Sequence, residues 1–133
     1  MKILFIEDNE QMGILVGSLL RGHGFQVDHF SVGRQGIERF RQDPDSWDAV
    51  ILDLELPDMP GKDLIPEMAR LCPRLPIIIY SGSSGMHQVR ERFELHSAGA
   101  SALLAKPCGG KDLLDVLNHL IEIPPVPVKP SLS

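Results

Sequence analysis

The chain has few of the residues from which metal or disulfide scaffolds are built. It contains two cysteines, Cys72 and Cys108, which form neither a CxxC motif nor a metal-ligand spacing, so we expect incidental or buried thiols. Its five histidines are scattered along the sequence, without the spacing of a zinc site. These observations argue against a zinc site.

Long apolar runs and an excess of basic residues are also missing. No run approaches the roughly 20 residues of a membrane span, and the start MKILFIEDN has acids where a signal peptide needs a small-residue cleavage site. The formal net charge of −5 argues against a surface for DNA phosphates or anionic lipid. We therefore expect a cytoplasmic protein that binds neither nucleic acid nor membrane.

At 133 residues and 43% hydrophobic, the chain has material for one domain with a single core. Short apolar runs rich in β-branched residues span 2–6, 49–53 and 77–80, and weaker runs span 25–30 and 102–105. Such runs are typical of parallel strands covered on both faces. Between these runs, apolar residues recur with helical spacing, and we expect each such set to face the core. The five sets are Met12, Leu15, Val16, Leu19 and Leu20; Ile37 and Phe40; Leu64, Ile65, Met68 and Leu71; Val89 and Phe93; Leu113, Leu114, Leu117, Leu120 and Ile121.

Strand and helix thus alternate five times, which predicts a doubly wound α/β domain with a five-stranded parallel sheet and five helices. In such sheets the loops beyond the carboxyl ends of the strands form the site. We expect the domain to span residues 1–122. Residues 123–133 are predicted to form a proline-rich C-terminal tail or linker.

Polar side chains follow four of the predicted strands. They are Glu7 and Asp8 after the first, Asp53 as the last residue of the third, Ser81 after the fourth and Lys106 after the fifth. Three converging carboxylates repel one another unless a cation lies between them, and an all-oxygen ligand set favours Mg²⁺. A fixed ammonium can pair with a carboxylate at rest and with a phosphoryl oxygen after transfer.

Each of these residues also has a plainer interpretation. Glu7 and Asp8 could cap a helix that begins near Asn9, and Asp53 could be a turn residue before PDMPG. Lys106 could be a solvated lysine, and SGSSG at 81–85 an ordinary turn. Taken together, however, their order at four strand ends favours a common site.

The chain resembles the receiver domains of bacterial two-component response regulators from residue 1 to about residue 121. The resemblance rests on Glu7-Asp8, on VILDLELPDMPG at 50–61, on Ser81 and on LLAKP at 103–107. It implies the flavodoxin-like strand order 2-1-3-4-5. It also implies a phosphorelay protein that accepts a phosphoryl group from a sensor histidine kinase, a phosphotransfer protein or a small phosphodonor.

The resemblance assigns roles residue by residue. Asp53 would be the phosphoacceptor, and Lys106 and Ser81 would hold the phosphoryl oxygens. Enzymatic activity would be limited to weak self-phosphorylation and self-dephosphorylation. An effector domain after residue 123 and a homodimer are both compatible with the family, and the family further implies a cis bond between Lys106 and Pro107.

The resemblance also implies how Mg²⁺ would be bound. Asp8, Asp53 and the backbone carbonyl of Glu55 would bind the ion directly, and Glu7 would act through water. The side chain of Glu55 could lie beside the site or point to solvent.

Three positions depart from the commonest family form. Ser81 replaces a frequent threonine and keeps the hydroxyl without the methyl that helps to fix its rotamer. Leu103 stands where an aromatic residue is usual, so the usual aromatic switch is in doubt. Cys108 stands where phenylalanine is frequent.

Three other functions stay open from the sequence. A receiver-like module that binds partners without phosphorylation has Leu103 as its only support. A hydrolase of the haloacid dehalogenase type needs an aspartate where this chain has Glu55, and more chain for a cap. An FMN carrier is disfavoured because Glu7 and Asp8 would repel the FMN phosphate.

Overall fold

The computed structural model describes residues 1–82, 88–106 and 109–122. Five parallel strands form one sheet in the order β2-β1-β3-β4-β5, which confirms the predicted flavodoxin-like topology. The strands are β1 (Lys2–Ile6), β2 (Gln26–Phe30), β3 (Ala49–Leu52), β4 (Ile77–Ser81) and β5 (Ala102–Ala105). The helices are α1 (Glu10–Gly22), α2 (Gly33–Gln42), α3 (Ile65–Leu71), α4 (Val89–Ala98) and α5 (Gly110–Glu122), with 3₁₀ turns η1 (Pro44–Ser46) and η2 (Gly61–Leu64).

The strands lie where the apolar runs predicted them. β1 and β5 have the predicted bounds, β2 begins one residue later, β3 ends just before Asp53, and β4 includes Ser81. The helix α5 ends at Glu122, and the predicted tail at 123–133 lies outside the described residues. No helix in the described part of the chain is long and apolar enough to cross a membrane.

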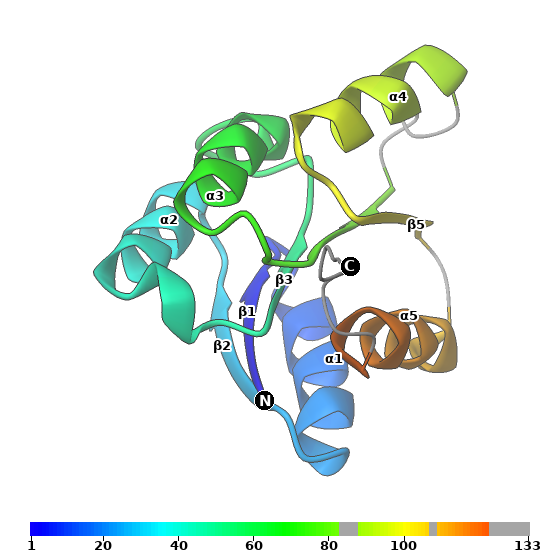
Figure 1. The fold of residues 1–133 in the computed structure, drawn as a ribbon. Helices are drawn as coiled ribbons and strands as arrows, with labels where there is room; N and C mark the ends of the chain where they lie inside the picture. Colours follow the sequence, from blue (N-terminus) through cyan, green and yellow to red (C-terminus); the bar gives the residue numbers. More distant parts are fainter. Residues whose placement is uncertain (83–87, 107–108, 123–133) are drawn as a thin grey trace, which may run out of the picture.

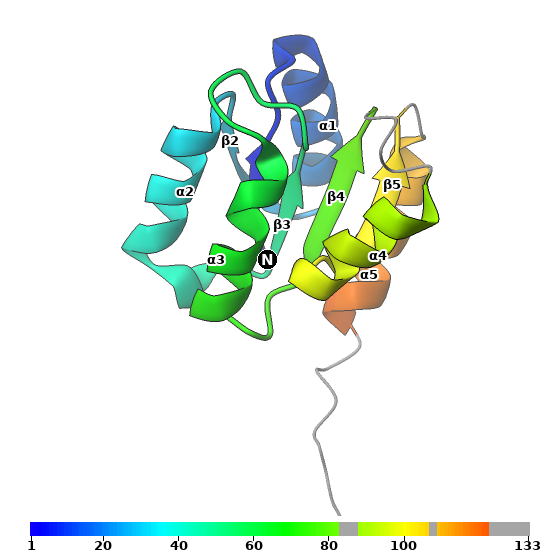
Figure 2. The ribbon, with the colours of Figure 1, turned by 90° about the horizontal axis from the view of Figure 1, so that it is seen from above.

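Helices cover both faces of the sheet, with α1 and α5 on one face and α2, α3 and α4 on the other (Figures 1 and 2). Successive side chains of a strand point to opposite faces. In β1, Leu4 and Ile6 therefore join the core under α2, α3 and α4, whereas Ile3 and Phe5 join the core under α1 and α5. The structure thus has two cores, one on each face of the sheet, where the sequence predicted one, and they explain why the central strands are apolar throughout.

The helical stripes were predicted correctly in most helices but not in all. Leu15 of α1 is 69% exposed, and Val89 and Phe93 of α4 are 83% and 60% exposed. The buried residue of α4 is Leu95, and Ala98 packs beside it against the same core. Spacing shows which residues share a face of a helix, but it does not show which face turns inward.

One helix receives its N-terminal cap from a distant loop. The first residues of α2 have no side-chain cap from Val32, and Asp58 supplies one from the loop after β3. Its carboxylate accepts hydrogen bonds from the backbone N–H groups of Arg34 (2.9 Å) and Gly33 (2.8 Å), which lower the pKa of Asp58. The cap fixes the loop that follows Asp53 against α2.

Candidate functional site

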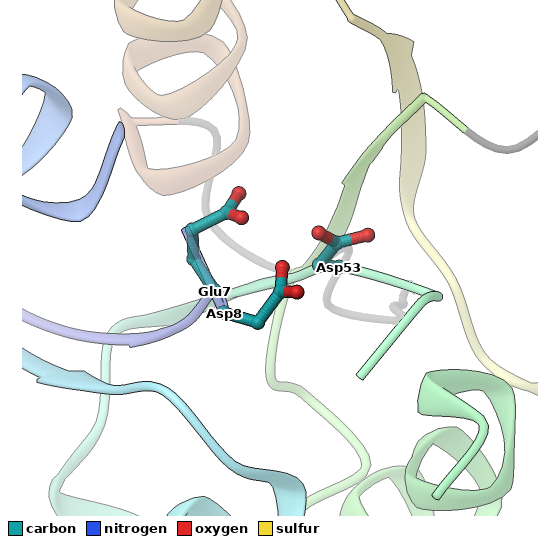
Figure 3. Close-up of side chains that lie close together, drawn as sticks. All are labelled: Glu7, Asp8 and Asp53. Carbon is teal, nitrogen blue, oxygen red and sulfur yellow. The ribbon is translucent and has the colours of Figure 1, made fainter. Parts of the chain in front are cut away.

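Three carboxylates meet at the carboxyl edge of the sheet, where β1 and β3 lie side by side. Glu7 and Asp8 follow β1 and Asp53 follows β3, and Figure 3 shows their side chains close together. One carboxylate oxygen from each lies within 4.8 Å of the others. Glu7 and Asp53 are buried, at 0% and 4% exposure, whereas Asp8 is exposed.

Lys106 brings a positive charge to the two buried carboxylates. Its Nζ donates to Oε1 of Glu7 and, at 3.1 Å, to Oδ2 of Asp53. The ammonium also lies 5.4 Å from the centre of the Tyr80 ring. Burial alone would lower the pKa of Lys106, but its hydrogen bonds to Glu7 and Asp53, together with the attraction of their charges, outweigh burial and raise that pKa. Lys106 is therefore a fixed cation in the resting site, not a solvated lysine.

Glu7 is the most deeply buried acid of the group. Burial raises its pKa above the ordinary value, although hydrogen bonds from Lys106 and from the backbone N–H of Asn9 (3.1 Å) act in the opposite direction. The helix-cap interpretation of Glu7 is wrong. Asn9 caps α1 by accepting a hydrogen bond from the N–H of Met12 at 2.9 Å, and Glu7 faces the site.

Asp53 is held in place by donors on both carboxylate oxygens. Its Oδ1 accepts from the buried hydroxyl of Ser81 at 2.8 Å and from the backbone N–H of Glu55 at 3.0 Å. Its own N–H donates to the carbonyl of Ile6 at 3.0 Å, which ties the residue to β1. The predicted meeting of three carboxylates, a hydroxyl and an ammonium is thus present, although their catalytic roles stay predictions.

The loop after Asp53 folds back on itself. The N–H of Gly61 donates to the carbonyl of Leu54 at 2.7 Å, and Glu55 forms a β-bridge with Pro60. A Cβ atom at Gly61 would overlap the carbonyl oxygen of Asp53, so this close approach requires glycine. The turn holds the Glu55 N–H against Asp53.

The side chain of Glu55 is exposed, which answers the question of its orientation. The side-chain oxygens that come together belong to Glu7, Asp8 and Asp53. The predicted use of the Glu55 backbone carbonyl as an Mg²⁺ ligand stays a prediction. The predicted cis bond before Pro107, and Cys108, fall outside the described residues.

The donor set suits a hard divalent cation. Three carboxylates converge without histidine or cysteine among them, and oxygen ligands of this kind fit Mg²⁺ in a site that keeps several waters. A second cation would also relieve the carboxylate repulsion that Lys106 relieves only in part. The residues present therefore fit the ion that the sequence predicts.

Two neighbours of the site were not identified from the sequence. His29 Nε2 lies 2.7 Å from the carbonyl oxygen of Glu7, and its ring packs 5.3 Å from that of Phe5. Tyr80 lies beneath Lys106 and contacts Met12 of α1 through its hydroxyl at 3.9 Å. No motif marks either residue, because each contact joins segments that are distant in sequence.

Known proteins resemble this chain in sequence and in fold. The family described as "Response regulator receiver domain" matches residues 3–118. The transcriptional regulatory protein QseB of Escherichia coli O157:H7 is 40% identical over 107 residues, which are 80% of this chain and 47% of QseB. The aerobic respiration control sensor protein ArcB of Escherichia coli K12 is 32% identical over 109 residues, or 80% of this chain and 13% of ArcB.

A solved receiver domain from Clostridium thermocellum superposes with a TM-score of 0.83 at 28% identity. The match covers 91% of this chain and 94% of that one. This chain spans less than half of the length of QseB and a small part of ArcB, so both relatives have further segments beyond the matched region.

Proposed function

This chain belongs to the response regulator receiver domain family, and on that premise we propose that it is a phosphorylation-controlled switch in a two-component phosphorelay. Asp53 accepts a phosphoryl group from the phosphohistidine of a sensor histidine kinase or of a phosphotransfer protein, in the cytoplasm. The observation that carries the proposal is the buried Asp53 carboxylate, which lies between the Ser81 hydroxyl and the Lys106 ammonium.

The transfer follows from the positions of these groups. A carboxylate oxygen of Asp53 attacks the phosphorus, the bond from phosphorus to the imidazole nitrogen breaks, and the electron pair leaves with the imidazole. Phosphoryl transfer passes through a loose transition state, so positioning and charge neutralisation supply most of the catalysis. Ser81 and Lys106, which donate to the two oxygens of Asp53 at rest, are placed to donate to the phosphoryl oxygens.

The acid cluster supplies the metal site of this proposal. Asp8 and Asp53, with the backbone carbonyl of Glu55, would bind Mg²⁺, and Glu7 would contribute through water. When bound, the ion supplies charge neutralisation for the phosphoryl oxygens. The buried ion pair of Lys106 with Glu7 would neutralise the Glu7 carboxylate whether or not Mg²⁺ is bound.

The added charge of the phosphoryl group provides the switch. A phosphoryl group brings about one further negative charge beside Lys106 and three strong acceptor oxygens. The hydroxyl of Ser81 and the ammonium of Lys106 then have new acceptors, and the ends of β4 and β5 respond. Residue 103, half-buried against the core under α2, α3 and α4, is a leucine, so the readout works without an aromatic rotamer change.

Partner and output belong to the same proposal. QseB, which is similar to this chain over 107 residues, is named a transcriptional regulatory protein. We expect an effector domain after residue 123, which would give this protein a receiver followed by an output domain. We expect the receiver itself not to bind nucleic acid, in line with its net charge of −5. Homodimer formation stays a prediction to be tested by sedimentation with and without phosphorylation.

Intact-mass spectrometry after incubation with acetyl phosphate and Mg²⁺ tests the proposal. We expect one phosphoryl adduct on the wild-type protein, none on Asp53→Asn, and none in the presence of a chelator. Asp63→Asn is the matched control, because Asp63 is an exposed aspartate in the nearby turn η2. An adduct that persists in Asp53→Asn would refute the assigned acceptor. A folded protein that takes no phosphoryl group would favour the phosphorylation-independent binding module.

A further inference from the structure

A groove of about 680 Å³ lies between α4 and the segment formed by η2 and α3. We call it the α3–α4 groove; α3 and α4 lie side by side on the same face of the sheet (Figure 2). Its volume is within the range of roughly 300 to 1,000 Å³ that is usual for ligand sites. The phosphorelay chemistry proposed above uses none of its walls except the start of the loop after Asp53.

The floor of the α3–α4 groove is apolar. Leu54 comes from the loop after Asp53, Pro66 from α3, and Leu95 and Ala98 from α4. Leu54 and Ala98 are only partly buried, so an occupant with apolar side chains would remove more of their surface from water. The floor therefore favours an occupant with an apolar face.

The rim of the groove is acidic. Glu55, Asp63, Glu91 and Glu94 contribute four carboxylates, against one ammonium from Lys62 among the described lining residues. Three of these acids are exposed, and Glu91 is half-buried. The contact of Glu94 with Arg90 is 4.0 Å long between exposed side chains, so it neutralises little of this charge.

We propose that the α3–α4 groove binds a basic amphipathic helix of a partner protein. Apolar side chains on one face of that helix would cover the floor, and lysine or arginine side chains beside that face would meet the acidic rim. The four carboxylates repel phosphates and acidic peptides, which excludes anionic ligands. This binding does not require the phosphorylation proposed above, so it is measurable on the unphosphorylated protein.

The position of the groove gives the binding a regulatory consequence. Leu54 and Glu55 line the groove and directly follow Asp53, and the N–H of Glu55 donates to the Asp53 carboxylate. An occupant of the groove and a phosphoryl group on Asp53 would therefore both act on Glu55. Any such coupling is reciprocal, and it rests on the proposed function, whereas the docking itself does not.

A titration of the ¹⁵N-labelled, unphosphorylated chain with short helical peptides tests the docking. The probe is a peptide of leucine and lysine with leucine along one face, and its control replaces every lysine with glutamate. We expect the lysine peptide to shift the backbone amide signals of Leu54, Lys62 and Ala98, with an affinity that falls as salt rises. The glutamate peptide should not bind.

Substitutions in the groove test the contributions of its charge and of its shape to peptide binding. Glu94→Lys should weaken binding by about tenfold or more, because like charges across an interface repel. The matched control Glu38→Lys changes an exposed glutamate of α2 and should bind as the wild type does. Ala98→Met fills the floor without a change of charge and should also weaken binding.

Several results would overturn the proposal. One is equal binding of the lysine and glutamate peptides, and another is unchanged affinity in Glu94→Lys. A third is a set of shifts centred on the exposed apolar residues of α1 (Ile14, Leu15) or of α4 (Val89, Phe93) instead of the groove. Concentration-dependent shifts at the groove without peptide would assign it to a second copy of the chain and would equally overturn it.

Discussion

Replacement of Lys106 by methionine removes the one charge that the described site opposes to its carboxylates. Methionine keeps most of the aliphatic stem, so the change isolates the ammonium. The Lys106 side chain is 18% exposed, and its partners Glu7 and Asp53 have side chains that are 0% and 6% exposed. The variant therefore leaves two buried carboxylates beside each other without a cation.

The size of the effect follows from this burial. Removal of one partner of a buried ion pair costs about 3–5 kcal/mol of unfolding free energy, because the other charge stays buried and uncompensated. We expect about 3 kcal/mol, the lower end of that range, since the Lys106 side chain is itself partly exposed to water. Lys111 with Asp115 is the matched exposed pair, with side chains 88% and 62% exposed. Lys111→Met should cost no more than about 0.5 kcal/mol.

The loss should also depend on pH. Burial raises the pKa of Glu7 above its ordinary value of 4.5, and loss of the Lys106 hydrogen bond raises that pKa further. A group whose pKa is raised in the folded state favours folding when protonated and loses that contribution as pH rises through the raised value. The cost of Lys106→Met should therefore be largest at neutral pH and shrink as pH falls toward 4.5.

Urea unfolding with a chelator present measures the effect. Trp47 is the single tryptophan of the chain and is 4% exposed, so its fluorescence reports unfolding. Equal slopes against urea in all proteins would show that the comparison is valid. If Lys106→Met were no more destabilising than Lys111→Met, the view of Lys106 as the resting counter-ion of the buried acids would be refuted.

Three further predictions use the surroundings of the site. Asp58→Ala should lower the unfolding free energy by about 1 kcal/mol at pH 7 through loss of the α2 cap. Because the pKa of Asp58 is lowered in the folded state, this difference should disappear as pH falls below the ordinary value of 3.8. Urea unfolding at several pH values measures both effects. Gly61→Ala should lower the unfolding free energy by about 1–3 kcal/mol, because the new Cβ atom would overlap the carbonyl of Asp53. Gly22→Ala is the control, since a Cβ atom there meets nothing within 4 Å, and it should leave the unfolding free energy unchanged in the same assay. Ser81→Ala should slow adduct formation from acetyl phosphate by about a hundredfold, as does loss of one donor in an oxyanion hole, and unchanged kinetics would remove Ser81 from the mechanism.

Most of the fold was predictable because the central strands have no polar alternation. β1, β3 and β4 are almost wholly buried, and such runs are typical of parallel strands under two layers of helices. The site was predictable for a related reason. Parallel strands bring their carboxyl ends together, so residues that follow different strands, such as Asp8, Asp53 and Lys106, meet without further information.

The features that were missed depend on long-range packing. In α4, Val89 and Phe93 share a face, but the core lies under Leu95, and the exposed pair was wrongly placed inward. The α2 cap comes from Asp58, 25 residues after Gly33, and no local pattern shows such a partner. The sequence also could not show that Lys106 pairs with buried Glu7 as well as with Asp53, because that choice depends on burial.

Whether Asp53 carries the phosphoryl group can be determined by locating that group in the chain. After reaction with acetyl phosphate and Mg²⁺, borohydride reduces an aspartyl phosphate to the side-chain alcohol of homoserine, and peptide mapping identifies its position. We expect a reduced residue at position 53 and an unmodified chain when Mg²⁺ or the phosphodonor is left out. Reduction at Glu7, at Asp8 or at any other acid, with Asp53 intact, would contradict this expectation.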